Sequence, residues 1–217
     1  MADLASFVAA LRDAAAARPA DIAHDPGHLE RVWQNACQLA PDEGVAVGSP
    51  LAAAAWLHDL VALPKDHPDR RAASRRSAVE AGPILRARGL PERDIAEVRH
   101  AIEAHSFSAG IAPRTPLARV IRDADRLDAL GAVGLARCLA VSATLGRPLH
   151  HPTDPFARAR PLDDERWAVD HFATKLLGLP ETMATASGTA LARRRARPLR
   201  AFLADLAEEI GSAPPDW

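Results

Sequence analysis

The composition of this chain favours helices and disfavours strands along its whole length. Alanine makes up roughly a fifth of the residues and has the highest helix propensity. Tyrosine is absent, and alternating runs of β-branched residues, which strands prefer, are hard to find. A capping side chain stands directly before a proline at Asp25-Pro26, Ser49-Pro50 and Thr115-Pro116, as is typical of helix starts. We therefore predict an all-α fold.

Two segments carry the most definite helical patterns. From Pro26 to about residue 40 the apolar residues recur every three or four positions, which predicts an amphipathic helix with one buried face. Residues 50–62 (PLAAAAWLHDLVA) are apolar almost all round, which predicts a central helix buried on every side and stopped by Pro64. We expect further helices near residues 72–88, 91–105, 116–145 with breaks at Gly131 and Gly134, 163–178 and 181–210, and a loop over 146–164.

Length, charge and cysteine content restrict the function classes. A chain of 217 residues is enough for one sizeable core, so we predict a single domain over residues 1–217. Lys and Arg number 27 and Asp and Glu 28, a balance that argues against a dedicated nucleic-acid binder. Cys37 and Cys138 form no paired motif, the first residues carry an acid rather than cations, and no apolar run approaches the roughly 18 residues of a membrane span. We expect a cytoplasmic protein without a membrane partner.

His58 and Asp59 stand out because they are polar residues in the apolar 50–62 segment. An ionised carboxylate in a dry core is strongly destabilising unless a cation or hydrogen-bond donors compensate it. Two interpretations remain open at this point. The residues are a satisfied structural pair, with Asp59 capping a neighbouring helix and His58 bonded to a carbonyl, or they belong to a functional site.

Other potential ligands fall on faces that we expect to be buried. His28 lies four residues before Val32, on the apolar face of its helix. Asp125 and Asp128 lie four and seven residues after Ile121, which turns both carboxylates inward. Histidine and carboxylate ligands suit a borderline divalent ion such as Mn, Fe, Co, Ni or Zn, and a catalytic site keeps coordination positions open.

The order His28, His58-Asp59, Asp125 resembles the H…HD…D signature of the HD-domain superfamily of metal-dependent phosphohydrolases, whose fold is an all-α helical bundle. Longer strings are similar to a small single-domain bacterial branch of that superfamily. They are HDPGHLERVW (24–33), LHDLVALPKDHPDR (57–70), AIEAHSFS (101–108), RDADRLDALGAVGLAR (122–137) and DPFARARPLDDERWAVDHFATKLLGLP (154–180). The resemblance therefore runs over most of the chain.

The resemblance implies a divalent metal ion, with Mg also allowed, and four protein ligands, which fall on His28, His58, Asp59 and Asp125. Branches with two metals carry further histidines between the HD pair and the last aspartate. His100 and His105 stand in that interval, but five residues apart they diverge by about 140° on a helix. We therefore expect one metal ion.

Three basic residues are candidates for phosphate binding. Lys65, one of only two lysines, follows the HD pair in a loop and either contacts phosphate or is solvated. Arg31, three residues after His28, either grips a second phosphate or pairs with an acid. Arg70 is close enough to Lys65 in sequence to contribute to the same phosphate-binding site.

The candidate catalytic residues are Lys65, His105 and Asp128. His105 is suited to proton transfer or a phosphate contact, the alternative being a core histidine. Asp128 is suited to support a ligand histidine or a bound water. Asp123 lies two residues from Asp125 on the same helix, so we expect it at the surface.

The prediction is a metal-dependent phosphohydrolase of a small phosphorylated metabolite, with a nucleotide as the first choice. A triphosphate cleaved to monophosphate and pyrophosphate is the first substrate class, and a monophosphate is the second. The alternative is a non-catalytic module that uses the metal to bind a nucleotide as a signal. We expect no nucleic-acid partner, and the sequence allows a homodimer.

Overall fold

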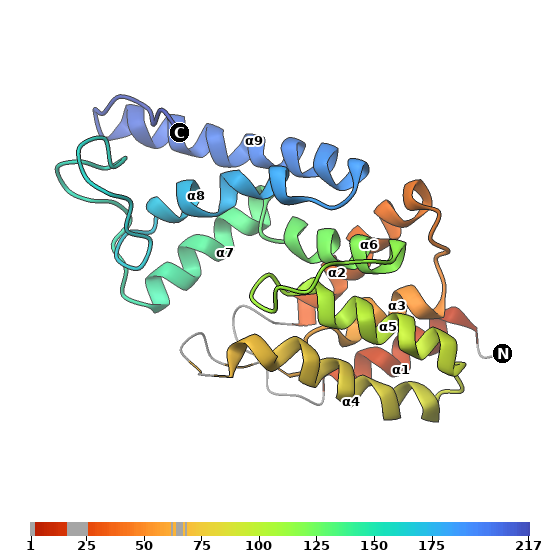
Figure 1. Cartoon of the computed structure of the whole chain (residues 1–217). Coiled ribbons are helices and arrows are strands. Elements are labelled where there is room, and N and C mark those ends of the chain that lie inside the picture. The colour runs from red at the N-terminus through yellow and green to blue at the C-terminus, as the bar shows by residue number, and fades with distance from the viewer. Residues whose placement is uncertain (1–2, 17–25, 62, 64–66, 68) are drawn as a thin grey trace. The chain divides into compact units, whose positions relative to one another are not determined.

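The computed structural model describes residues 3–16, 26–61, 63, 67 and 69–217, and every regular element in these ranges is helical (Figure 1). The predicted all-α fold is confirmed. The chain divides into two compact units, residues 1–125 and 126–217.

The first unit contains most of the helices. They are α1 (Leu4–Ala16), α2 (Pro26–Leu39), the 3₁₀ turn η1 (Ala40–Glu43), α3 (Ser49–Leu57), the 3₁₀ turn η2 (Arg70–Ala72), α4 (Ala73–Ala87), α5 (Glu92–His105) and α6 (Pro116–Leu127), whose last two residues belong to the second unit. The sequence analysis placed no helix before residue 26. Phe7 and Leu11, four residues apart on α1, are buried, and this spacing was the available signal.

Helix α3 is the centre of the first unit. All seven residues from Leu51 to Leu57 are buried, and α3 contacts α1, α2, α4 and α5. A helix that is apolar on every side can only be stable when other elements surround it, as the 50–62 pattern predicted.

The predicted end of this helix, at Pro64, is wrong. The α-helix ends at Leu57, and His58 and Asp59 lie in the turn that follows. The His58 ring donates from Nδ1 to the carbonyl of Ala55 at 2.8 Å, and Ser77 Oγ on α4 accepts a bond from Val61 N at 3.0 Å. The His58 and Ser77 side chains therefore bond to the Ala55 carbonyl and the Val61 N–H, which a continuing helix would pair with other backbone groups, and the helix ends.

The three predicted helix starts have different outcomes. Thr115 caps α6 as expected, since its Oγ1 accepts a bond from Ala118 N at 3.2 Å. Ser49 is already the first residue of α3, and the cap position is Gly48, so the predicted serine cap is wrong. Asp25 lies outside the described residues.

The second unit contains α7 (Gly131–Thr144), α8 (Asp170–Thr174), the 3₁₀ helix η3 (Leu176–Thr182) and α9 (Ala186–Glu209). Helix α9 contacts α7 and η3. The break expected at Gly131 is present, because this glycine has φ +71° in the left-handed region. The break expected at Gly134 is wrong, because α7 continues through this residue.

The segment between α7 and α8 is longer than predicted. The helix expected near residues 163–178 begins only at Asp170. The Asp170 carboxylate is fully buried, and it accepts two bonds from Arg160, at 2.5 and 2.8 Å, and one from Asp163 N at 2.7 Å. This ion pair holds the preceding chain in an irregular conformation.

Within the described ranges, no single helix is long and apolar enough to cross a membrane; α6 and α7 pass that test only when taken together across the break between them.

Candidate metal centre

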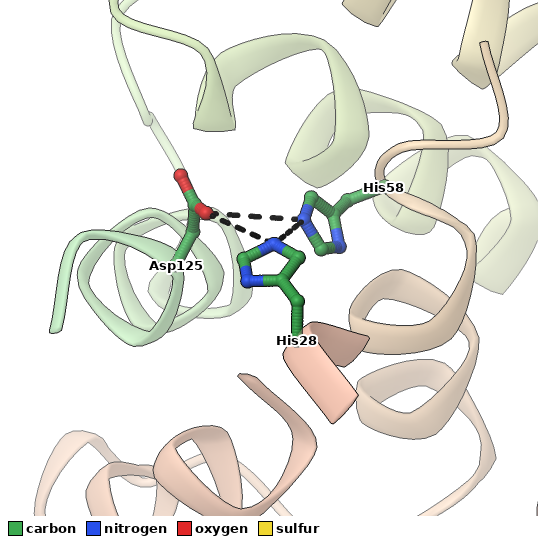
Figure 2. A group of neighbouring side chains, drawn as sticks. All are labelled: His28, His58 and Asp125. Carbon is green, nitrogen blue, oxygen red and sulfur yellow. Dashed lines mark hydrogen bonds and ion pairs between the residues drawn. The ribbon is translucent and has the colours of Figure 1, made fainter. Parts of the chain in front are cut away.

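Three helices of the first unit bring histidine and aspartate side chains to one point (Figure 2). His28 comes from the first turn of α2, His58 from the residue after α3, and Asp125 from the last turn of α6. The Nε2 atoms of the two histidines are 3.3 Å apart. Asp125 Oδ1 lies 3.5 Å from His28 Nε2 and 3.9 Å from His58 Nε2.

Asp59 completes the group as its fourth member. Its Oδ2 lies 3.4 Å from His58 Nε2 and 3.9 Å from His28 Nε2. Its other oxygen, Oδ1, lies 3.3 Å from Nε2 of His105, the last residue of α5. One carboxylate oxygen therefore faces the group, and the other is held from behind by a buried histidine.

Backbone carbonyls set the orientation of two of the imidazole rings. His58 Nδ1 donates to Ala55 O, so Nε2 is the ring atom that faces the group, where it can hold a proton or, when deprotonated, ligate a metal ion. His105 Nδ1 donates to Ile102 O at 2.7 Å. Nε2 of His105 therefore faces the Asp59 carboxylate.

The electrostatics of the group favour positive charge at its centre. Burial of His58 opposes protonation, but the Asp59 charge and hydrogen bond, the Asp125 charge and the Ala55 carbonyl outweigh it and raise the pKa of His58 to about 9. For Asp59 burial acts in the opposite direction, because it disfavours the charged carboxylate and so would raise the pKa of Asp59. His58 and His105 overcome that effect and hold the Asp59 pKa well below its usual range.

The donor set fits a divalent ion. Ligands at about 2.0–2.2 Å from one ion lie roughly 3–3.6 Å from each other. Three of the five N–N and N–O separations in the group are 3.3, 3.4 and 3.5 Å, within that range, and the other two, at 3.9 Å, are slightly longer. Two imidazoles and two carboxylates suit Mn, Fe, Co, Ni or Zn. The histidines are 3% and 0% exposed, whereas the Asp59 and Asp125 side chains are 19% and 28% exposed. Water and a substrate can therefore approach on the carboxylate side.

Asn35 is a residue at this centre that the sequence analysis missed. It lies on α2, seven residues after His28, and is 4% exposed. Its Nδ2 donates to the carbonyl of Ala124 at 3.0 Å, directly before Asp125. Ala124 is in the last turn of α6. This bond joins α2, which carries His28, to α6, which carries Asp125.

The remaining candidates occupy several places. Arg31 is half-buried on α2, one turn after His28, and Arg70 is the half-buried first residue of η2. Lys65 lies outside the described residues. Asp128 is buried in the second unit, where its carboxylate accepts a bond from Arg137. The roles assigned to these residues stay predictions.

Of two predictions about α5 and α6, one is wrong and one is confirmed. Asp123, expected at the surface, is completely buried, so that expectation is wrong: α6 is enclosed on more than one face. His100 and His105 diverge as predicted. Nε2 of His100 accepts a bond from Arg114 N at 3.0 Å, while His105 contacts Asp59.

Comparison with known proteins agrees with this geometry. The HD domain family model matches residues 27–130, the range that contains all four residues of the centre. The protein YpgQ of Bacillus subtilis is 31% identical over 191 residues, which cover 86% of this chain and 84% of YpgQ. The chain belongs to the HD-domain family.

Solved structures extend the match of this HD-domain protein over nearly the whole chain. A crystal structure of B. subtilis YpgQ in complex with ADP is 27% identical, with a TM-score of 0.71, covering 96% of this chain and 98% of YpgQ. An HD-superfamily hydrolase from Bacillus thuringiensis is 26% identical, with a TM-score of 0.72, covering 97% of both chains. The helical-bundle fold of the HD family is thus shared by residues beyond the 27–130 range.

Proposed function

We propose that this HD-domain protein is a metal-dependent phosphohydrolase of a small phosphorylated metabolite, with a nucleoside or deoxynucleoside triphosphate as the first substrate class. The observation that carries the proposal is the convergence of His28, His58, Asp59 and Asp125 on one point open to solvent on the carboxylate side. YpgQ, its relative of similar length, has been crystallised with ADP, which supports a nucleotide. Both units would act together as one domain.

The ligands of the divalent ion would be the two Nε2 atoms, Asp59 Oδ2 and Asp125 Oδ1. When bound, a divalent ion at such a centre supplies Lewis-acid activation of a phosphoryl group and of water. The buried histidines would hold the ion in place, because the Ala55 carbonyl restrains the orientation of the His58 ring. The two partly exposed carboxylates leave room for the reacting phosphate.

Further residues would handle protons and phosphate charge. His105 holds Asp59 Oδ1 and is placed to keep or release a proton at Nε2. Arg31, Lys65 and Arg70 would neutralise the phosphate oxygens as the bond to the leaving group breaks. The role of Asp128, whose carboxylate bonds to Arg137, stays a prediction.

A metal-retention experiment tests the centre itself. The purified protein should hold about one transition-metal ion per chain, and His58→Ala and Asp125→Ala should each abolish retention. His100→Ala is the matched control, because this histidine lies on α5 and bonds to Arg114 N instead of the centre. Full occupancy in both centre variants would contradict the assignment.

An activity matrix tests the reaction. Nucleoside and deoxynucleoside mono-, di- and triphosphates are incubated with several divalent ions, and phosphate and pyrophosphate are measured separately. Activity should be lost on chelation and in Asp59→Ala. If the wild type binds a nucleotide but hydrolyses no phosphoester faster than Asp59→Ala, the protein is a binding module and the proposal fails.

The two lysines allow a matched test of the phosphate contact. Lys65→Ala should keep the metal and lose turnover on the order of 100-fold if the ammonium stabilises charge in the transition state. Lys175→Ala changes an exposed lysine of the second unit and should leave turnover unchanged. Equal kinetics in the two variants would make Lys65 a solvated loop residue.

A further inference from the structure

One exposed stripe of helix α9 carries its charges in two separate blocks. Arginines occupy the first half of the stripe and acids occupy its end, and the side chains of both blocks are exposed. The charged residues of the stripe are Arg193, Arg194, Arg197, Asp205, Glu208 and Glu209. At 3.6 residues per turn, all of them point within about 80° of the direction of Ala201, which is also exposed.

This order of charges is unfavourable within the helix itself. Residues three or four positions apart are neighbours on a helix surface, where like charges repel. Arg197 has two arginines at these distances, Asp205 has two glutamates, and no basic residue of α9 has an acid there. The acids also lie near the C-terminal end, where the helix dipole favours cations, and the last turn has no basic residue. The charges of the stripe therefore do not stabilise α9 by themselves.

The rest of the second unit does little to match these charges. Arg193 pairs with Glu181 of η3 at 3.1 Å, but the two side chains remain 63% and 68% exposed. In the described part of the chain, Arg194, Arg197 and Asp205 form no side-chain ion pair. The stripe is thus open to a partner that carries the opposite charges in the reverse order.

A second copy of α9 has that order when it runs antiparallel to the first. Arg197 and Asp205 lie four residues before and after Ala201, and Arg194 and Glu208 lie seven residues before and after it. A two-fold axis at Ala201 therefore places each of these arginines opposite an acid of the other helix. The outer pair, eight residues on either side, follows the same rule.

The residues nearest this axis allow two helices to come close. Pro198 and Ala204 lie three residues on either side of Ala201, and all three are exposed and small. Packed helices have axes about 8–10 Å apart, depending on the side chains at the contact. The centre of the stripe is therefore free of long side chains, and the charged residues lie at both ends of the contact.

We propose that α9 forms a homodimer contact, in which two copies of the helix pack antiparallel about a two-fold axis at Ala201. The pairs Arg197–Asp205 and Arg194–Glu208 each occur twice in this dimer. A nucleic acid fits the stripe less well, because its phosphates are repelled by the acidic block. One helix pair is smaller than the standard interface of about 1,600 Å², so we expect a dissociation constant on the order of 10–100 µM.

Sedimentation equilibrium of the full chain tests the proposal. The mass should rise above the 23.1 kDa of the monomer as the concentration increases. It should fall back when salt is raised from 0.1 to 1 M, which shortens the Debye length from about 10 to about 3 Å. Arg194→Glu/Arg197→Glu makes the stripe mostly acidic and should weaken association at least about tenfold. The control Arg75→Glu/Arg93→Glu changes two exposed arginines of the first unit and should leave association unchanged.

A complementary variant separates charge pairing from damage to the fold. Asp205→Arg/Glu208→Arg makes the stripe mostly basic, and this variant alone should also associate at least about tenfold more weakly. Mixed with Arg194→Glu/Arg197→Glu, it should form a heterodimer, because every charge of the stripe then faces its opposite. Wild-type protein that stays monomeric up to about 1 mM overturns the proposal, and the stripe then serves a different partner. Unchanged association of both variants, or no association of their mixture, overturns it as well.

Discussion

Replacing Asn35 by alanine removes a hydrogen bond that ties α2 to α6 directly beside Asp125. The Asn35 side chain is 4% exposed, and its bond to Ala124 O is 3.0 Å long. Loss of this buried hydrogen bond, together with the packing of the Asn35 side chain, costs about 1–3 kcal/mol. We expect Asn35→Ala to lower the free energy of unfolding by that amount.

The same change should weaken metal binding, because the bond fixes the last turn of α6 that carries Asp125. If the whole loss acted on the position of this ligand, 1–3 kcal/mol would correspond to roughly 5- to 150-fold in affinity. Other bonds of α6 also restrain Asp125, so we expect the lower part of that range, about tenfold. Asn35→Leu, which keeps the approximate shape but lacks the donor and adds no charge, should behave in the same way.

The assay is calorimetric titration of Mn²⁺ into metal-free protein, together with denaturant unfolding in the presence of a chelator. Ser74→Ala is the matched control: Ser74 is 3% exposed, and its hydroxyl donates to Glu103 O at 3.1 Å, a bond between α4 and α5. Ser74→Ala should lose stability and keep the affinity for Mn²⁺. If Asn35→Ala lost stability but bound Mn²⁺ as tightly as Ser74→Ala, the positioning argument would be refuted.

Two further predictions concern other parts of the chain. A Cβ atom at Gly134 would lie 2.2 Å from the carbonyl of Ala129, so Gly134→Ala should lower the free energy of unfolding by roughly 2–3 kcal/mol in a denaturant titration. At Gly178 the added atom meets open space, so Gly178→Ala should leave the free energy of unfolding unchanged. Equal losses in the two variants would contradict the steric explanation. Burial, followed by the charge of Glu30, raises the pKa of the Cys37 thiol to about 11, so only about one thousandth of it is thiolate at pH 8. With the other cysteine replaced by serine, alkylation by iodoacetamide should keep accelerating up to about pH 11, and a plateau near pH 9 would contradict this.

The sequence by itself determined the features that depend on neighbouring residues in the chain. Helix propensity and apolar spacing predicted the all-α class, the amphipathic α2 and the fully buried α3. The same spacing placed His28 and Asp125 on inward faces. The linear order of histidines and aspartates then resembled the HD signature, and the chain belongs to that family.

Only the tertiary structure decided how these groups meet. The end of α3 at Leu57 depends on Ser77 of α4 as well as on the His58 ring, and no local pattern contains that contact. The division of the Asp59 oxygens between the centre and His105 likewise needs two elements that lie far apart in sequence. Asn35 was invisible for the same reason: a single polar residue on a helix face gains a role only when the carbonyl of another helix is packed against it.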